Sequence, residues 1–293
     1  MFLCKISCER GSISISAVTC VAVTEGAPST LARVNGHIFE QVTAQPAPEL
    51  VLFVADYVGY RMEGFPPGIH AGLPSQYLTF IVSLGDPIDV MAMPDPARRP
   101  QRFAALVGGL HAAPAMIRHD GNQHGLQLRL TPAGARALFG QPAGELASSV
   151  LDLGDVLGPL AHELTDRVNT SGSWSARFAA VDDVLIRALR DSPSPRPELT
   201  FTWSRRHLSE QFRIEYGHPP KVMARVMRFE RARRLLVSHA RPALADVAAA
   251  CGYADQAHLT RDWRALAGQS PRAWLASEHL PFVQDDEVAT QAV

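Results

Sequence analysis

The feature of this chain that most constrains its fold is a fourteen-residue pattern that occurs twice, with every matched position 51 residues apart. Such a repeat predicts one supersecondary unit built twice. In each copy a leucine and an aromatic residue stand four apart, which predicts a short helix with a buried stripe, and a glycine follows where the helix should end. The first copy comprises His207, Leu208, Phe212, Arg213, Gly217 and Pro220, and the second comprises His258, Leu259, Trp263, Arg264, Gly268 and Pro271.

The residues before the second copy complete the unit. The Ala-rich stretch Ala243–Cys251 has helical periodicity, Gly252 predicts a turn, and Asp255 is a suitable N-cap for the next helix. This is the layout of a helix-turn-helix, whose second helix enters the major groove of DNA. Between the copies, Lys221–Ser238 predicts a basic helix of about 27 Å. With turns at both ends, it could hold two reading helices roughly one DNA turn apart, ~34 Å.

The C-terminal part contains the stretches SRRHLSEQF, GHPPKV, RFERARRLL, LADVAAACGYADQAHLTRDW and GQSPRAWL. Together they resemble the DNA-binding domain of the AraC/XylS family of bacterial transcription regulators, over roughly Trp203–Leu275. The resemblance implies that helices around residues 205–213 and 255–265 read DNA major grooves. The implied base contacts are Arg206, Ser209 and Glu210 in the first unit and Gln256, Ala257, His258 and Arg261 in the second.

Charge supports a nucleic-acid partner for this part of the chain. Residues 198–278 hold 13 Lys and Arg against 8 Asp and Glu, although the whole chain has a net charge of −1. A solvated charged face is the alternative interpretation. The expected contacts to DNA phosphates are Arg213, Lys221, Arg225, Arg228 and Arg264. A helix cannot turn every side toward DNA, so we expect some of these to face the protein, with Arg225 or Arg228 pairing with Glu230 or Glu215.

One segment departs from the family pattern. Ser192–Thr200, which stands 51 positions before the helix of the second unit, reads SPSPRPELT, and three prolines exclude an ordinary helix there. The first unit is therefore expected to be truncated. In addition, Glu210 stands where the family often has an arginine, and a carboxylate repels phosphates although it can accept a hydrogen bond from cytosine. The alternative function is a ligand-sensing or interaction protein with a degenerate, weakly DNA-binding C-terminal domain.

The predicted fold class is α+β, with a β-rich N-terminal domain, trailing helices and an all-α C-terminal domain of two helix-turn-helix units joined by a long helix. The N-terminal part contains the stretches YRMEGFPPGIHAGLPSQYLTFIVSLGDPI, GGLHAAPAMIRHDG and LTPAGARALFG. They resemble one actinobacterial AraC-type subgroup, which implies a sensing or dimerising domain. Predicted strands are Leu50–Tyr57, Tyr77–Leu84, Ile88–Met93, Arg102–Val107 and Gly125–Thr131, and predicted helices are 132–139, Asp155–Val168 and Ser175–Arg190. The expected divisions are an irregular extension (1–45), the N-terminal domain (46–190), a linker (191–197), the DNA-binding domain (198–279) and a disordered tail (280–293).

The N-terminal part offers little catalytic chemistry. His70, His111, His119 and His124 have no diagnostic metal-ligand spacing, and we expect no metal and no cofactor. The run His162–Asp166 nearly matches a zinc-hydrolase helix but lacks the second histidine, so it predicts a polar helix face. The aromatic residues Tyr57, Tyr60, Phe65 and Tyr77 are candidates for lining a ligand pocket or for ordinary core.

These observations predict a non-enzymatic regulator. The expected location is the cytoplasm, associated with the nucleoid, because no apolar run reaches the length of a membrane span. Double-stranded DNA is the expected partner. A small-molecule effector, RNA polymerase and a second copy of the chain are candidate partners.

Overall fold

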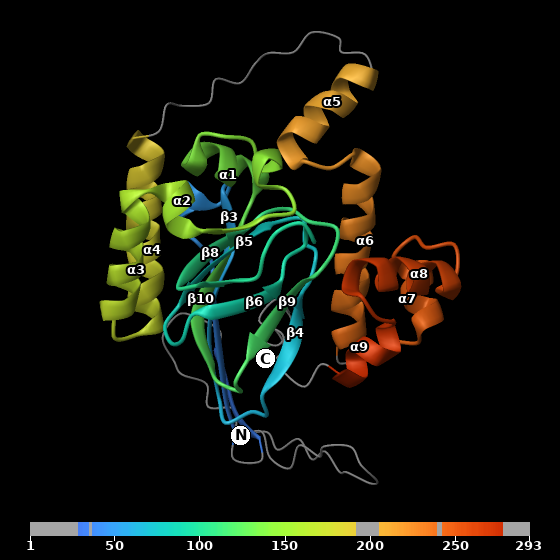
Figure 1. Ribbon diagram of the computed structural model, residues 1–293, viewed down its shortest axis with the longest axis horizontal. Helices are drawn as coiled ribbons and strands as arrows, with labels where there is room; N and C mark the ends of the chain where they lie inside the picture. Colours follow the sequence, from blue (N-terminus) through green and yellow to red (C-terminus); the bar gives the residue numbers. More distant parts are fainter. Residues whose placement is uncertain (1–28, 35–36, 192–204, 239–241, 278–293) are drawn as a thin grey trace.

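The computed structural model describes residues 29–34, 37–191, 205–238 and 242–277 (Figure 1). A β-rich N-terminal domain with two antiparallel sheets is followed by a helical C-terminal part, which confirms the predicted fold class. The predictions for the proline-rich segment 192–200, for most of the linker and for the tail lie outside the described residues.

The larger sheet has the strand order β1-β2-β3-β10-β5-β8-β11. Its strands are β1 (Ser29–Val34), β2 (His37–Ala44), β3 (Val54–Glu63), β10 (Gln123–Leu130), β5 (Leu78–Ser83), β8 (Ala105–Gly108) and β11 (Val150–Asp152). The smaller sheet has the order β4-β9-β6-β7, formed by β4 (Gly68–Gly72), β9 (Ala115–His119), β6 (Ile88–Ala92) and β7 (Gln101–Phe103).

The helices of the N-terminal domain follow the strands in the chain, except for the short 3-10 turn η1 (Pro48–Leu50). They are α1 (Pro132–Phe139), the 3-10 turn η2 (Ala143–Leu146), α2 (Leu153–Leu157), α3 (Pro159–Thr170) and α4 (Trp174–Asp191). The C-terminal helices are α5 (Arg205–Tyr216), α6 (Pro220–Val237), α7 (Leu244–Ala250), α8 (Gln256–Ala267) and α9 (Pro271–Ser277).

Several predicted boundaries need correction. The expected irregular extension 1–45 is wrong for residues 29–34 and 37–44, since β1 pairs with β2 and β2 pairs with β3. The predicted strand Leu50–Tyr57 begins only at Val54 and continues as β3 to Glu63, and residues 68–72, where no strand was predicted, form β4. The predicted helix 155–168 is two helices, because Gly158 has a φ of 57° between α2 and α3. The predicted strand 102–107 is divided at Ala104 between the two sheets.

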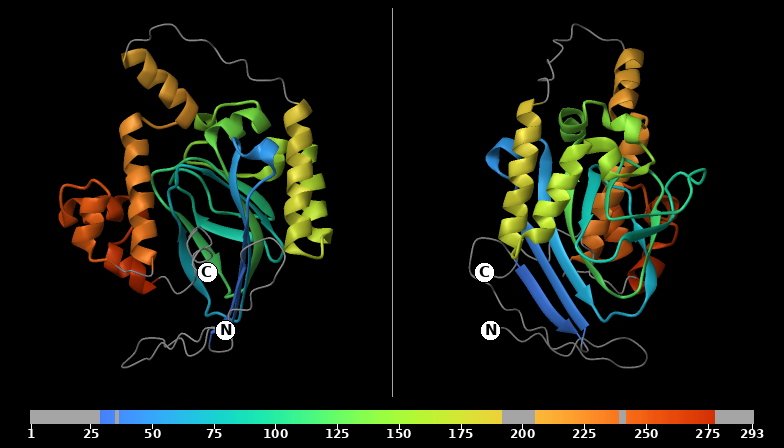
Figure 2. Two further views of the ribbon diagram at one scale, coloured as in Figure 1. Left: turned by 180° about the vertical axis from the view of Figure 1, so that it is seen from behind. Right: turned by 60° about the vertical axis from the view of Figure 1, so that its left-hand side comes forward.

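Helices α3 and α4 cover one side of the N-terminal domain, and the C-terminal helices lie on the opposite side (Figures 1 and 2). Buried side chains of β3, β5 and β10 pack against α3 and α4 in the main hydrophobic core. Within it the hydroxyl of Tyr57 donates to Asp182 on α4 at 2.7 Å, and the same carboxylate accepts from the backbone N–H of Ala47 at 3.1 Å. Burial and this neighbouring carboxylate raise the pKa of Tyr57.

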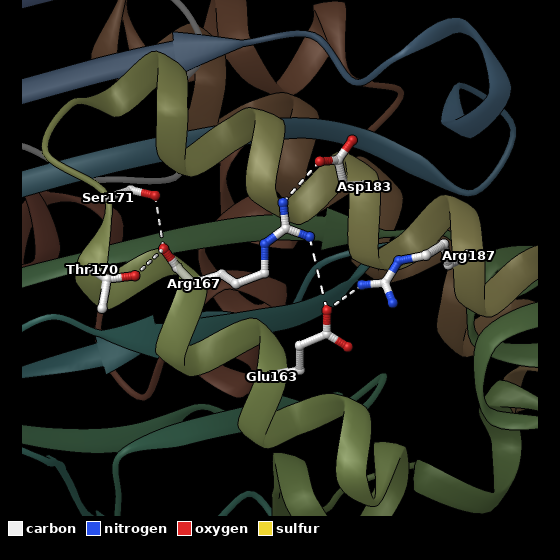
Figure 3. Close-up of polar contacts among 6 residues, drawn as sticks. All are labelled: Glu163, Arg167, Thr170, Ser171, Asp183 and Arg187. Atoms are coloured by element: carbon white, nitrogen blue, oxygen red, sulfur yellow. Dashed lines mark hydrogen bonds and ion pairs between the residues drawn. The ribbon is translucent and has the colours of Figure 1, made fainter.

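The outer surfaces of α3 and α4 are joined by ion pairs (Figure 3). Arg187 on α4 pairs with Glu163 on α3, and Arg167 donates to Asp183 at 2.8 Å. His162 and Asp166 are exposed on α3. The run 162–166 is therefore the polar face of an amphipathic helix, as predicted.

The four histidines considered as metal ligands do not converge. The rings of His70 and His119 lie 5.6 Å apart between β4 and β9, whereas His111 bonds through Nδ1 to the carbonyl of Ala113 at 2.6 Å. Among the described residues, no group of three or more His, Cys, Asp or Glu side chains is placed to hold a metal ion. Burial lowers the pKa of His111 to about 4.

The stability of the sheet–helix core can be tested with two adjacent aspartates. Asp182→Ala leaves the buried Tyr57 hydroxyl without its acceptor, and we expect a loss of about 1–3 kcal/mol in the free energy of unfolding. Asp183→Ala is the matched control, since it removes only an exposed pair with Arg167 and should cost about 1 kcal/mol or less. Urea denaturation of both variants makes the comparison, and equal losses would contradict it.

Acid should destabilise the fold through His111. Its pKa in the folded state lies below that of an unfolded chain, so the unfolded state binds the proton more tightly. Burial of the neutral imidazole therefore costs no stability well above pH 6.5, where the unfolded side chain is also neutral. As the pH falls from 6.5 toward 4, the free energy of unfolding decreases by about 3 kcal/mol. His111→Gln should flatten the pH dependence of unfolding over this window, while the exposed His162→Gln should leave it unchanged.

Candidate nucleic-acid interface

The second repeat forms the predicted helix-turn-helix. Helix α7 ends at Ala250, Gly252 adopts a φ of 75° in the turn, and α8 begins after Asp255, whose carboxylate accepts from the N–H of His258 at 2.6 Å. Gly268, with a φ of 75°, ends α8. Each of these features matches a local sequence signal for a cap or a turn.

The first repeat has the same backbone geometry. Helix α5 occupies residues 205–216 and α8 occupies residues 256–267, so the two helices are offset by the same 51 residues as the sequence pattern. Gly217 ends α5 with a φ of 70°, and Pro220 opens α6 as Pro271 opens α9. The prediction of one unit built twice is confirmed for these helices and the turns after them.

The apolar stripe of α8 is fully covered. Leu259 and Trp263 have no exposed surface, and the ring of Trp263 stands 4.8 Å from Phe229 of α6 and 5.3 Å from Trp274 of α9. Val247 of α7 belongs to the same cluster. Helix α8 is therefore held by three helices of its own domain.

The stripe of α5 is covered differently. Leu208, which the repeat predicts to be buried, is 51% exposed, so this prediction is wrong. Phe212 and Tyr216 are half-buried, stack on each other at 4.2 Å, and pack against the core of the N-terminal domain.

The polar face of each repeated helix is turned to solvent. On α8 the side chains of Gln256, Ala257, Arg261 and Arg264 are exposed. His258 is half-buried, because its ring stands against Tyr253 at 5.2 Å. On α5 the corresponding exposed residues are Arg206, Ser209, Glu210 and Arg213, and Arg213 lies 3.8 Å from the Glu210 carboxylate.

An acidic residue that sequence reasoning overlooked organises part of this surface. The carboxylate of Asp262 is buried on α8 and accepts from Nε of Arg225 at 3.1 Å. Arg228 lies 3.6 Å from the same carboxylate and rests over the ring of Tyr253. The expected pairing of these arginines with Glu230 or Glu215 is therefore wrong. The spacing of His258 and Asp262, four residues apart on one helix face, could have drawn attention to this carboxylate. In the structure, Nε2 of His258 lies 3.9 Å from Oδ2 of Asp262.

Glu215 and Glu230 instead form hydrogen bonds to the N-terminal domain. Glu215 of α5 accepts from Arg136 of α1, and Glu230 of α6 accepts from the hydroxyl of Ser75 at 3.1 Å. Lys221, in contrast, is exposed at the start of α6. Of the five expected phosphate contacts, Arg213, Lys221 and Arg264 are exposed, and Arg225 and Arg228 are half-buried against Asp262.

A separate cavity of about 910 Å³ opens in the N-terminal domain. Its lining includes Tyr60, Met62, Arg102, Arg118, His119 and His124. Only one of the four candidate aromatic residues, Tyr60, lines it, since Tyr57 bonds to Asp182, Phe65 stacks on His37 and Tyr77 lies under Arg129. The cavity combines apolar and charged side chains and lies outside the helix-turn-helix part.

No described helix is both long enough and apolar enough to cross a membrane.

Comparison with protein families gives a match for the C-terminal part. Residues 200–277 match the family described as "Helix-turn-helix domain". No curated protein is similar in sequence at a significant level.

Comparison with solved structures also gave matches. ToxT from Vibrio cholerae has 11% sequence identity, covering 75% of this chain and 97% of that chain with a TM-score of 0.39. Wild-type ToxT from the same organism with a bound unsaturated fatty acid has 8% identity, covering 79% and 96% with a TM-score of 0.41. The AraC-like transcriptional activator CuxR has 12% identity, covering 85% and 79% with a TM-score of 0.20.

The family match spans both repeated helices, α6 between them and the complete second unit. Residues 200–277 therefore carry a helix-turn-helix domain of the AraC type, a DNA-binding domain of transcription regulators.

Proposed function

We propose that this chain is a sequence-specific transcription regulator that reads two major-groove segments of DNA with α5 and α8. The observation that carries the proposal is the shared geometry of the two repeats. At corresponding positions, 51 residues apart, Arg206 and Ala257, Ser209 and Thr260, and Glu210 and Arg261 lie on the polar sides of equivalent helices. Helices of this kind can present hydrogen-bonding groups to base edges in a major groove.

The side chains expected to contact bases differ in how exposed and how restrained they are. Gln256 and Arg261 are exposed and suited to pairing with adenine and guanine, respectively. Ala257 can offer only an apolar contact, and His258 is restrained by Tyr253. In the first unit, Arg206 and Ser209 are exposed, whereas Glu210 lies near Arg213, which offsets its charge.

The described elements support two domains: the N-terminal one begins at residue 29, before the expected 46, and residues 205–277 lie within the expected DNA-binding domain 198–279. The cavity of the N-terminal domain supports a small-molecule effector as a further partner, because it is large enough for a metabolite and has both apolar walls and charged groups. A second copy of the chain and RNA polymerase remain candidate partners.

The degenerate-domain alternative has a direct test. Random genomic fragments are incubated with the full chain, and the bound fraction is sequenced. Enrichment of a common motif supports the regulator, and retention of fragments without any shared motif supports an interaction or sensing protein with weak DNA binding.

Base reading by α8 can be tested on the motif so obtained. Gln256→Ala should weaken binding to the preferred site by about 5- to 150-fold, equivalent to 1–3 kcal/mol, and leave random DNA almost unaffected. Arg261→Lys keeps the charge but removes the planar, two-pronged donor, so it should cause a similar selective loss. Fluorescence anisotropy with both DNAs measures the ratio. Equal losses on both DNAs would show that these side chains do not read sequence.

The exposed cations should determine the salt dependence of binding. Lys221→Ala or Arg264→Ala should each flatten the slope of log affinity against log salt by about 0.9, because one phosphate contact is lost. Arg225→Ala should instead lower the melting temperature, since the buried Asp262 loses a hydrogen-bond donor. Arg99→Ala, an exposed cation of the N-terminal domain, controls for net charge and should change neither quantity. Unchanged slopes for both exposed cations would identify this basic surface as a solvated face.

A further inference from the structure

The two repeated helices have the same backbone but different supports. In the second unit, α8 rests on α6, α7 and α9. The covered side of α5 instead meets the N-terminal domain, through Phe212 and Tyr216.

The contact between α5 and the N-terminal domain is close enough to involve the backbones directly. A Cβ atom added to Gly144 of η2 would lie 2.7 Å from the nitrogen of Gly217 and 3.0 Å from the carbonyl oxygen of Arg213, and closer still to that of Ile214. Gly217 has a φ of 70°, so it also favours glycine for conformational reasons. A pair of glycines therefore permits η2 to sit against the end of α5.

Polar groups fix the orientation of this contact. The guanidinium of Arg136 on α1 donates two hydrogen bonds to the carboxylate of Glu215, one of them from Nε at 3.2 Å. Next to it, Nε2 of His218 lies 3.1 Å from the carbonyl oxygen of Leu110. A two-pronged Arg–carboxylate pair restricts rotation as well as distance, so it sets the direction in which α5 leaves the N-terminal domain.

A second attachment holds α6 further along its length. The carboxylate of Glu230 is 2% exposed and accepts from the Ser75 hydroxyl at 3.1 Å and from the Gln76 N–H at 3.4 Å. Leu73, from the same loop between β4 and β5, is buried in the hydrophobic cluster of the C-terminal helices. Both the end of α5 and the second half of α6 are thus attached to the N-terminal domain.

We propose that the N-terminal domain is the supporting element of the first helix-turn-helix unit, with η2 and α1 occupying the role that α7 has in the second. The inference rests on the proposed function for its consequence on DNA. The positions of the two reading helices then depend on different supports, since α8 is held by its own domain and α5 by a surface of the N-terminal domain. Any ligand or partner that moves η2 or α1 changes recognition of one half of the DNA site and leaves the other half intact.

The full chain carrying Gly144→Val tests this support. The valine side chain wedges η2 away from α5, and hydrogen exchange of the α5 amides should accelerate by about tenfold or more, while α8 amides exchange as in the wild type. Gly172→Val is the matched control, because a side chain there enters open space. Unchanged exchange in α5, or equal acceleration in α5 and α8, overturns the proposal. This measurement requires no DNA, so its outcome is separate from that of the proposed function.

A footprint on the selected DNA site tests the consequence. Gly144→Val should lose protection of one major-groove segment and retain the other, and Gly172→Val should protect both. Protection of both segments by Gly144→Val overturns the proposal, whereas absence of any footprint by the wild type would reject the proposed function instead.

A charge reversal covers the case in which the wedge unfolds the N-terminal domain. Glu215→Arg places two guanidinium groups together and should reproduce the selective acceleration of α5 exchange, and the double variant with Arg136→Glu should restore the wild-type rate. An unchanged α5 exchange rate in Glu215→Arg overturns the proposal. So does a double variant in which α5 exchanges as fast as in Glu215→Arg alone.

Discussion

One helix, α6, contributes side chains to two hydrophobic cores, and the arrangement of the two halves of the molecule depends on it. Met223, near the start of α6, is buried in the core of the N-terminal domain. Val226, Phe229 and Leu236 are buried in the core of the C-terminal helices. Because protein interiors are closely packed, rotation or translation of α6 would open a void in both cores. Apolar burial along a single helix therefore fixes the position of the reading helices relative to the β-rich domain.

The repeat is symmetric in backbone and asymmetric in environment. Local rules act equally on both copies, and each helix ends at a glycine with positive φ and is followed by a proline that opens the next helix. Burial follows the neighbours instead. Leu259 is covered completely, and its counterpart Leu208 is half-exposed beyond the edge of the N-terminal domain. Identical local geometry thus places equivalent side chains in different surroundings.

Electrostatics within the second unit limits the charge available to DNA. Asp262 on α8 pairs with Arg225 and Arg228 of α6, and these donors offset the cost of burying its carboxylate. The exposed positive charge consequently lies on other residues, among them Lys221, Arg261 and Arg264.

The sequence by itself determined the elements whose signals are local. The repeat predicted α5 and α8, and the periodicity between its copies predicted α6, each within three residues, because caps, glycine stops and helical periodicity act over a few positions. Alternating apolar residues likewise predicted β5, β6 and β10. Strands β1, β2, β9 and β11 escaped prediction, because they are short or weakly patterned and are stabilised by pairing with strands already in place.

Only the tertiary structure decided which side chains were free to act. The exposure of Leu208, the capture of Arg225 and Arg228 by Asp262, and the attachment of Glu215 to Arg136 all depend on residues distant in sequence. Periodicity gives the face of a helix on which a side chain lies, and it carries no information about what packs against that face. The positions of α5 and α8 were therefore readable from the chain, while the packing of α5 against the N-terminal domain followed from long-range contacts alone.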